Sequence, residues 1–167
     1  VFFILCSFCL VAQINESDAH NLKANLSLTG FWQGGNVNTL IFRARSEVSF
    51  KPWEQWVFKT QNSYVYQEFG REKADEDILS LNFLYIHPEK KIYPLLLAFV
   101  STNFRREIDA RYMAGAGVTF QVLKKKKNFL KFSLSSEYEE TNFDNNDFNF
   151  SDYDGSTTIN TFRATLW

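Results

Sequence analysis

Cysteine and histidine are scarce in this sequence, and their positions argue against several kinds of site. Both cysteines, Cys6 and Cys9, lie in the apolar stretch 1–12, so the rest of the chain has no disulfide framework. Neither His20 nor His87 has a neighbouring partner suited to catalysis or zinc binding. The sequence also lacks a glycine-rich phosphate loop, a nucleophile elbow and a paired-histidine helix motif. We therefore expect no enzyme activity, no cofactor and no metal centre.

A strong excess of one charge is missing too. The formal net charge is -1 and the sequence pI is near 6.2, whereas a nucleic-acid binder normally shows a clear basic excess. What the 167 residues do contain is apolar and aromatic side chains, at 45% and 17%, with 18 phenylalanines. This length suits one domain with a large apolar surface.

The apolar stretch 1–12 resembles the hydrophobic region of a secretory signal peptide and ends at Ala12, a small residue where a signal peptidase could cut. It is too short to cross a bilayer as a helix. No basic region or initiator methionine precedes it, so we expect this sequence to lack the start of the signal peptide. A lipid-modified cysteine is the weaker alternative, because neither cysteine follows a small-residue processing site. We therefore divide the chain into a signal peptide at 1–12, a short leader at 13–22 and a β-barrel domain at 23–167.

Residues 23–51 predict a β-hairpin, because two alternating arms flank a Gly-Gly-Asn turn. Apolar residues such as Leu28 and Phe42 alternate with polar ones, including Arg43 and Arg45. Each arm has about ten residues, the length of a tilted strand that crosses a bilayer, whereas strands usually have about five or six. Because the charged row cannot face an apolar core without a large desolvation cost, one face should meet lipid or core and the other water or countercharges.

Period-two patterns continue along the chain, without a convincing amphipathic helix. The expected further strands are 56–68, 78–87, 93–104, 112–122, 129–140 and 158–167. Short turns are expected at 52–55, 87–92 and 124–128, and longer loops at 69–77, 105–111 and 141–157. Alternation of short turns with longer loops is typical of outer-membrane barrels.

The predicted fold class is therefore all-β: an antiparallel up-and-down transmembrane β-barrel with about eight strands present, as a fragment of a larger barrel. Aromatic residues near the strand ends predict girdles at both membrane interfaces. The predicted girdle residues are Trp32, Trp53, Trp56, Tyr64, Tyr66, Tyr85, Tyr93, Tyr112 and Tyr138.

The predicted barrel has an apolar exterior and a charged interior. The outward set includes Leu28, Phe42, Leu81 and Phe132. The lumen-facing set is Arg43, Arg45, Glu47, Lys59, Lys131 and Glu137. In an eight-stranded barrel these charges would form a salt-bridged plug, whereas in a wider barrel they would line an anion-favouring pore.

Small and charged segments add three further predictions. Gly115 and Gly117, in a strand, indicate close approach by apolar residues of the preceding strand. The aspartates of 141–157 have oxygen ligands of the kind calcium takes, but their spacing does not fit an EF-hand, which favours a solvated loop. The lysines at 124–127 could touch anionic headgroups, although a basic turn is the simpler interpretation.

The hairpin at 26–50, with its Gly-Asn-Val-Asn-Thr turn, resembles the opening of the bacterial family of salt-induced outer-membrane proteins, a domain of unknown function. The segment Tyr-Met-Ala-Gly-Ala-Gly-Val at 112–118 is similar to a later strand of that family. The resemblance implies a Gram-negative outer-membrane barrel, with membrane lipid and the barrel-assembly machinery as partners and no catalytic residues. Family members are usually longer, and Thr165 and Arg163, in phase with Trp167, are polar, so we expect further strands beyond this chain.

The sequence thus predicts a porin-like bacterial protein of the cell outer membrane, with a structural or envelope-stress role and passive passage of a small solute. The alternative is a soluble periplasmic β-barrel or sandwich, similar to a lipocalin, that binds a small apolar ligand. A membrane-embedded barrel enzyme is a third class, but the sequence has no Ser–His pairing to support it.

Overall fold

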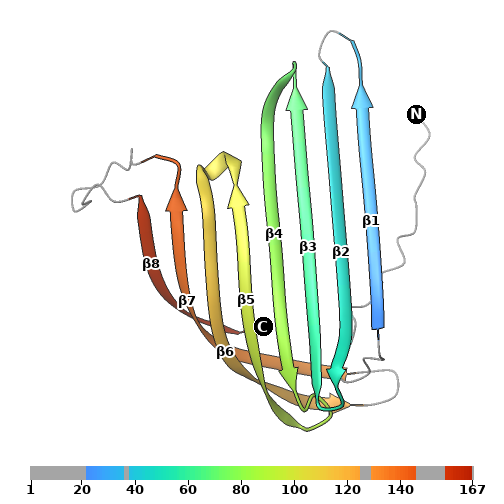
Figure 1. Ribbon diagram of the computed structural model, residues 1–167, viewed down its shortest axis with the longest axis vertical. Coiled ribbons are helices and arrows are strands. Elements are labelled where there is room, and N and C mark those ends of the chain that lie inside the picture. Colours follow the sequence, from blue (N-terminus) through green and yellow to red (C-terminus); the bar gives the residue numbers. More distant parts are fainter. Residues whose placement is uncertain (1–21, 36–37, 125–128, 146–156, 167) are drawn as a thin grey trace.

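The computed structural model describes residues 22–35, 38–124, 129–145 and 157–166. They form one antiparallel sheet in which all eight strands follow chain order (Figure 1). The strands are β1 (Leu22–Gln33), β2 (Thr39–Trp53), β3 (Trp56–Phe69), β4 (Glu72–Ile86), β5 (Ile92–Asn103), β6 (Ile108–Lys124), β7 (Phe129–Phe143) and β8 (Thr158–Leu166). A short 3-10 helix, η2 (Phe104–Arg106), lies between β5 and β6. The predicted all-β, up-and-down arrangement is confirmed.

No helix within the described residues is long and apolar enough to cross a membrane. The signal peptide, His20, the lysines at 125–127, most of the acidic loop and Trp167 lie outside the described residues. The predictions about signal cleavage, headgroup contact and calcium therefore stay predictions.

The β3–β4 connection differs from the expected loop at 69–77. Strand β3 continues to Phe69 and β4 begins at Glu72, so only Gly70 and Arg71 connect them. Both have positive φ, 63° and 72°, as a two-residue type I′ hairpin turn requires. The charged residues that suggested a loop pair across this hairpin instead, with the Tyr64 hydroxyl donating to Glu76 over 3.0 Å. The predicted loop was wrong because charged residues indicate only that a segment is exposed to solvent, and the exposed end of a hairpin can contain them as well as a loop.

The two other predicted loops are also shorter than expected. Strand β6 begins at Ile108, inside the expected loop 105–111, and β7 continues to Phe143, inside the expected loop 141–157. The connections after β3 and β5 are therefore short. The predicted alternation of short turns and longer loops is wrong for these two connections, so it no longer supports the barrel interpretation there.

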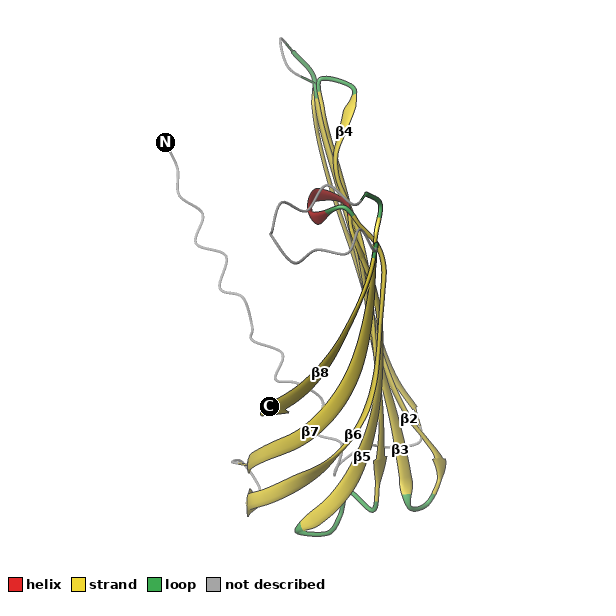
Figure 2. Ribbon diagram, turned by 90° about the vertical axis from the view of Figure 1, so that its left-hand side faces the viewer, coloured by secondary structure: helices red, strands yellow, loops and turns green. Residues whose placement is uncertain are grey.

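The sheet is curved and open. Strands β5 to β8 sweep sideways at their lower ends (Figure 2), and the β3–β4 hairpin rises above the upper ends of β5 to β8 (Figure 1). Strands β1 and β8 are the two edges and do not pair with each other. The described strands therefore do not close into a barrel.

Curvature gives the two faces of the sheet different environments. Leu95, Leu97 and Glu137 share one face, where their exposed fractions are only 2%, 5% and 1%. On the other face Leu134 and Phe162 are 54% and 80% exposed. Because side chains on the inside of a bend shelter one another, we call the face with Glu137 the concave face and the face with Leu134 the convex face.

Two glycines of β6 permit close packing on the concave face. Gly117 lies opposite Leu95 on β5 and Ser135 on β7, and Gly115 lies opposite Leu97 and Glu137 in the same way. A Cβ atom on Gly117 would lie 2.5 Å from the Leu134 carbonyl oxygen and 2.8 Å from Ser135 Cβ. The closest atoms at both glycines belong to β7, whereas the prediction named the apolar residues of β5, which lie opposite the glycines in the register.

Candidate functional site: the concave face

The predicted lumen-facing residues all lie on the concave face. The sheet register connects them: Lys59 lies opposite Phe83, Phe83 opposite Leu97, Leu97 opposite Gly115, and Gly115 opposite Glu137. Residues paired directly across antiparallel strands project to the same side. The remaining predicted residues, Arg43, Arg45, Glu47 and Lys131, occupy alternate positions on β2 and β7 in the same phase.

A first charge cluster joins β2 to β3. Lys59 Nζ lies 3.2 Å from Glu47 Oε1, and the two side chains are 8% and 22% exposed. The Gln61 amide donates to the same carboxylate oxygen over 3.3 Å. The ion pair is largely shielded from solvent, and the Lys59 ammonium group compensates the negative charge of Glu47.

A second cluster joins β6, β7 and β8. The Arg163 guanidinium lies 2.7 Å from Glu139 Oε1, and Arg111 Nε lies 3.6 Å from the same atom. Next to it Glu137 accepts hydrogen bonds from the Ser135 hydroxyl and, over 2.7 Å, from the Thr165 hydroxyl. The sequence prediction included only Glu137 from this group.

Period two would have identified two of the missing members, Glu139 and Arg163. Glu139 follows Glu137 by two positions, and Arg163 shares the phase of Thr165. Arg111 was placed in a loop, because β6 was expected to start later. The part played by Arg111 could therefore be found only from the true start of β6 and from its register with β7.

An apolar band separates the two charge clusters. It consists of alternate residues of β4 and β5: Leu79, Leu81, Phe83, Tyr85, Tyr93, Leu95, Leu97 and Phe99. The prediction that Leu81 faces outward with Leu28, Phe42 and Phe132 is wrong, because Leu81 lies opposite Gln61 on the concave face. The other three lie on the convex face, with exposed fractions of 60%, 38% and 41%.

Most predicted girdle aromatics lie on the convex face, but Tyr85 and Tyr93 do not. Tyr93 is only 1% exposed, its ring is 6.3 Å from that of Tyr85, and Lys131 Nζ lies 5.7 Å from the Tyr93 ring centroid. An outward girdle is therefore wrong for these two residues. On the convex face Trp53 and Trp56 flank the β2–β3 turn with ring centroids 5.3 Å apart.

The convex face also carries a small polar network. Asn62 donates to Ser46 over 3.2 Å and accepts from Ser80 over 2.7 Å, and Asn82 donates to Ser80 over 3.1 Å. Each amide and hydroxyl named here has a partner on a neighbouring or the same strand. The network therefore removes much of the cost of polar atoms on this largely apolar face.

His87 was expected to have no partner suited to catalysis or zinc binding, and the structure places a carboxylate next to it in the β4–β5 connection. Its Nδ1 lies 3.0 Å from Glu89 Oε1. Partial desolvation acts to raise the pKa of Glu89, but hydrogen bonds from its own backbone N–H and from His87, with the charges of His87 and Lys90, hold the pKa below its usual value. The pair lies on an exposed turn, away from both charge clusters.

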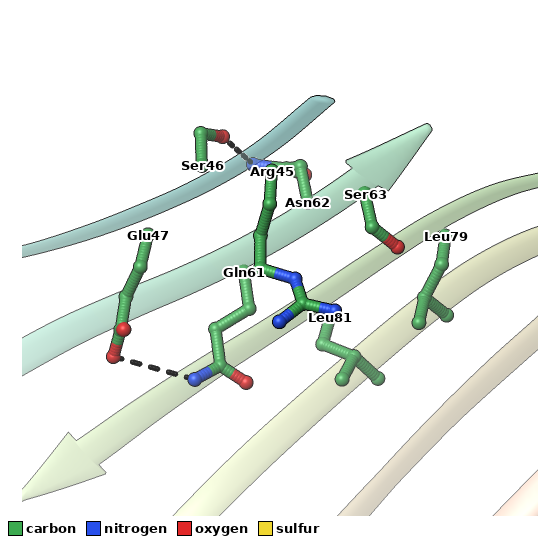
Figure 3. Close-up of a pocket in the computed structure, with 8 residues that line it drawn as sticks. All are labelled: Arg45, Ser46, Glu47, Gln61, Asn62, Ser63, Leu79 and Leu81. Atoms are coloured by element: carbon green, nitrogen blue, oxygen red, sulfur yellow. Dashed lines mark hydrogen bonds between the residues drawn. The ribbon is translucent and has the colours of Figure 1, made fainter. Parts of the chain in front are cut away.

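A hollow of about 290 Å³ opens beside Arg45 on the concave face. Figure 3 shows the side chains of Arg45, Glu47, Gln61, Leu79 and Leu81 on one side of the strands, with Ser46 and Asn62 on the other. Within the described part of the chain, the guanidinium groups of Arg43 and Arg45 take part in no hydrogen bond or ion pair. The site therefore offers uncompensated positive charge next to apolar surface.

Comparison with known proteins adds no relative. No protein-family model, no curated protein and no solved structure matches this chain.

Proposed function

We propose that this chain forms the wall of a β-barrel in the bacterial outer membrane. In this proposal the convex face meets hydrocarbon, and the concave face lines a wet interior through which a small solute passes without catalysis. Besides passage, the protein would have a structural role in the envelope.

The observation that carries the proposal is the opposite polarity of the two faces. Large apolar side chains such as Leu134 and Phe162 are exposed on the convex face, whereas Glu139 and Lys59 are buried and ion-paired on the concave face. Exposed apolar patches beyond a few hundred Å² are rare in soluble monomers and mark contact with a membrane or another protein. A membrane barrel needs this arrangement, because lipid surrounds it and its interior is polar.

Strand length and the resemblance described above give further support. Strands β2 to β7 have 12 to 17 residues, enough for the roughly 9–11 that a tilted membrane strand needs. The hairpin at 26–50 and the segment at 112–118 resemble salt-induced outer-membrane proteins. Because unpaired backbone groups are costly in hydrocarbon, the edges β1 and β8 would have to pair with other strands in a closed barrel.

Cell fractionation tests the proposal. We expect the protein in the outer-membrane fraction, resistant to extraction with carbonate or urea, and we expect its folded form to migrate differently from the boiled form on a cold SDS gel. Liposomes that contain the protein should then admit small solutes. Recovery of folded protein from the soluble periplasmic fraction would contradict the proposal.

One observation favours the alternative of a soluble binding module. The apolar band of β4 and β5 lies on the sheltered face, with Leu95 and Leu97 almost fully buried, as in the interior of a carrier for apolar ligands. That alternative predicts a soluble protein whose convex apolar side chains are covered by a partner. The same fractionation separates the two functions.

A further inference from the structure

Two arginines on β2 face the concave side without a partner in the described chain, although a carboxylate lies on the same strand. The nearest acidic side chain along that row, Glu47, is already bound by Lys59 at 3.2 Å and by Gln61 at 3.3 Å. Forming a further ion pair with Arg45 would require Glu47 to share a charge that Lys59 already compensates. The positive charge of Arg43 and Arg45 is thus available to an external anion.

The surroundings of Arg45 restrict what this anion can be. The hollow beside it has a volume of about 290 Å³, which corresponds to roughly ten water molecules in the liquid. Leu79 and Leu81 line the side away from β2, and Gln61 and Ser63 lie between them and Arg45 (Figure 3). A fully hydrated inorganic ion would make no favourable contact with the apolar side chains of Leu79 and Leu81.

The apolar surface continues beyond the hollow. Leu81 lies opposite Phe99 on β5, and Phe83 lies opposite Leu97, so the leucines of β4 join the apolar band on the same face. A molecule that starts at Arg45 therefore passes from a guanidinium group over a polar amide and hydroxyl to aliphatic and aromatic side chains. Guanidinium groups bind carboxylates with two parallel hydrogen bonds, which gives both affinity and orientation.

We propose that Arg45 binds the carboxylate of a small amphiphilic anion whose apolar chain lies on Leu79 and Leu81, and that Arg43, two positions away in the same row of β2, adds positive charge. The inference deepens the proposed function and rests on it, since it names the solute class that the concave face would accept. Arg45 holds the head group, and the leucines select against anions without an apolar body.

Equilibrium dialysis of radiolabelled octanoate against the purified protein in nonionic micelles tests this, with empty micelles as the blank. We expect saturable binding that unlabelled octanoate competes away, and that acetate, octanol and octylammonium compete at least about tenfold less well, because each lacks either the chain or the negative charge. Equal competition by octanol would mean partition into apolar surface alone and would overturn the inference.

Variants connect binding to the named residues. The double variant Arg43→Gln, Arg45→Gln should weaken octanoate binding by at least about tenfold. Arg45→Lys should weaken it less, since lysine keeps the positive charge but cannot donate two parallel hydrogen bonds to the carboxylate. Arg106→Gln, on the exposed helix η2, is the matched control and should bind like the parent protein. Ser63→Leu, which keeps strand propensity and fills the hollow, should also abolish binding even if the arginine variants fold poorly.

Failure of the inference and failure of the proposed function give different results. An outer-membrane protein whose octanoate binding is absent, or unchanged in the double variant and in Ser63→Leu, would refute the carboxylate site alone. Arginine-dependent binding by a protein that fractionates as soluble would keep the site and refute the membrane barrel.

Discussion

Replacing Gly117 with alanine would add a methyl group where the structure has no room. The new Cβ would lie 2.5 Å from the Leu134 carbonyl oxygen and 2.8 Å from Ser135 Cβ. Neither neighbour can rotate away easily, because one is a backbone atom and the other is the first side-chain atom of a residue that is only 3% exposed. The β6 and β7 backbones would have to separate locally to accept it.

The expected cost follows from the sum of two effects. Overpacking of a tight site costs about 1–3 kcal/mol, whereas replacing a strand glycine with alanine recovers roughly 0.5–1 kcal/mol of backbone entropy. We therefore expect Gly117→Ala to lower the free energy of unfolding by about 1–2 kcal/mol. Gly30→Ala is the matched control, because a Cβ there meets nothing within 4 Å, and it should be neutral or slightly stabilising.

Urea unfolding in nonionic micelles, followed by circular dichroism of the β-sheet signal, measures both variants. The loss should appear at Gly117 and not at Gly30. Equal stability of the two variants would show that β6 and β7 do not approach as closely as described, and it would refute the role of the β6 glycines in forming the concave face.

Two further predictions use the same assay. Glu139→Gln should destabilise the protein by about 2–4 kcal/mol, because its carboxylate is 5% exposed and forms ion pairs with arginines of two strands. Arg163→Gln should cost less than about 1 kcal/mol, because Arg163 is 48% exposed. Equal losses would contradict this assignment. Leu134→Lys should cost roughly 2–4 kcal/mol in lipid vesicles if Leu134 lies near the bilayer midplane, and less toward either interface. Asn25→Lys, at an exposed position of the concave face opposite Glu47, should cost little. The reverse order of the two losses would mean that lipid contacts the concave face.

Most of the fold followed from the alternation of polar and apolar residues. Because side chains of a strand alternate strictly between faces, Arg43, Arg45 and Glu47 had to share a face, as did Lys131 and Glu137. The prediction also put both rows on one face, because ionised side chains are costly on an apolar face, and the register across β4 and β5 shows that they share it.

Period two could not decide the orientation of β4 and β5. Leu95 to Val100 are apolar on both faces, and in β4 the residues between the leucines are the small polar Ser80 and Asn82. The sequence interpretation therefore turned Leu81 toward lipid with the other leucines. The register with β3 shows that Leu81 lies on the concave face, and Leu95 and Leu97 of β5 lie on the same face, opposite Gly117 and Gly115. Tyr85 and Tyr93 were misplaced for the same reason.

The central claim is that lipid contacts the convex face and water contacts the concave face. Single-cysteine variants, with Cys6 and Cys9 changed to serine, can carry an environment-sensitive fluorophore at Leu28 or Ser27 on β1 and at Leu134 or Ser133 on β7. In vesicles with brominated lipid chains, the account predicts blue-shifted, quenched emission at Leu28 and Leu134, and water-like, unquenched emission at Ser27 and Ser133. Quenching at the serine positions, or no quenching at any of the four, would contradict it.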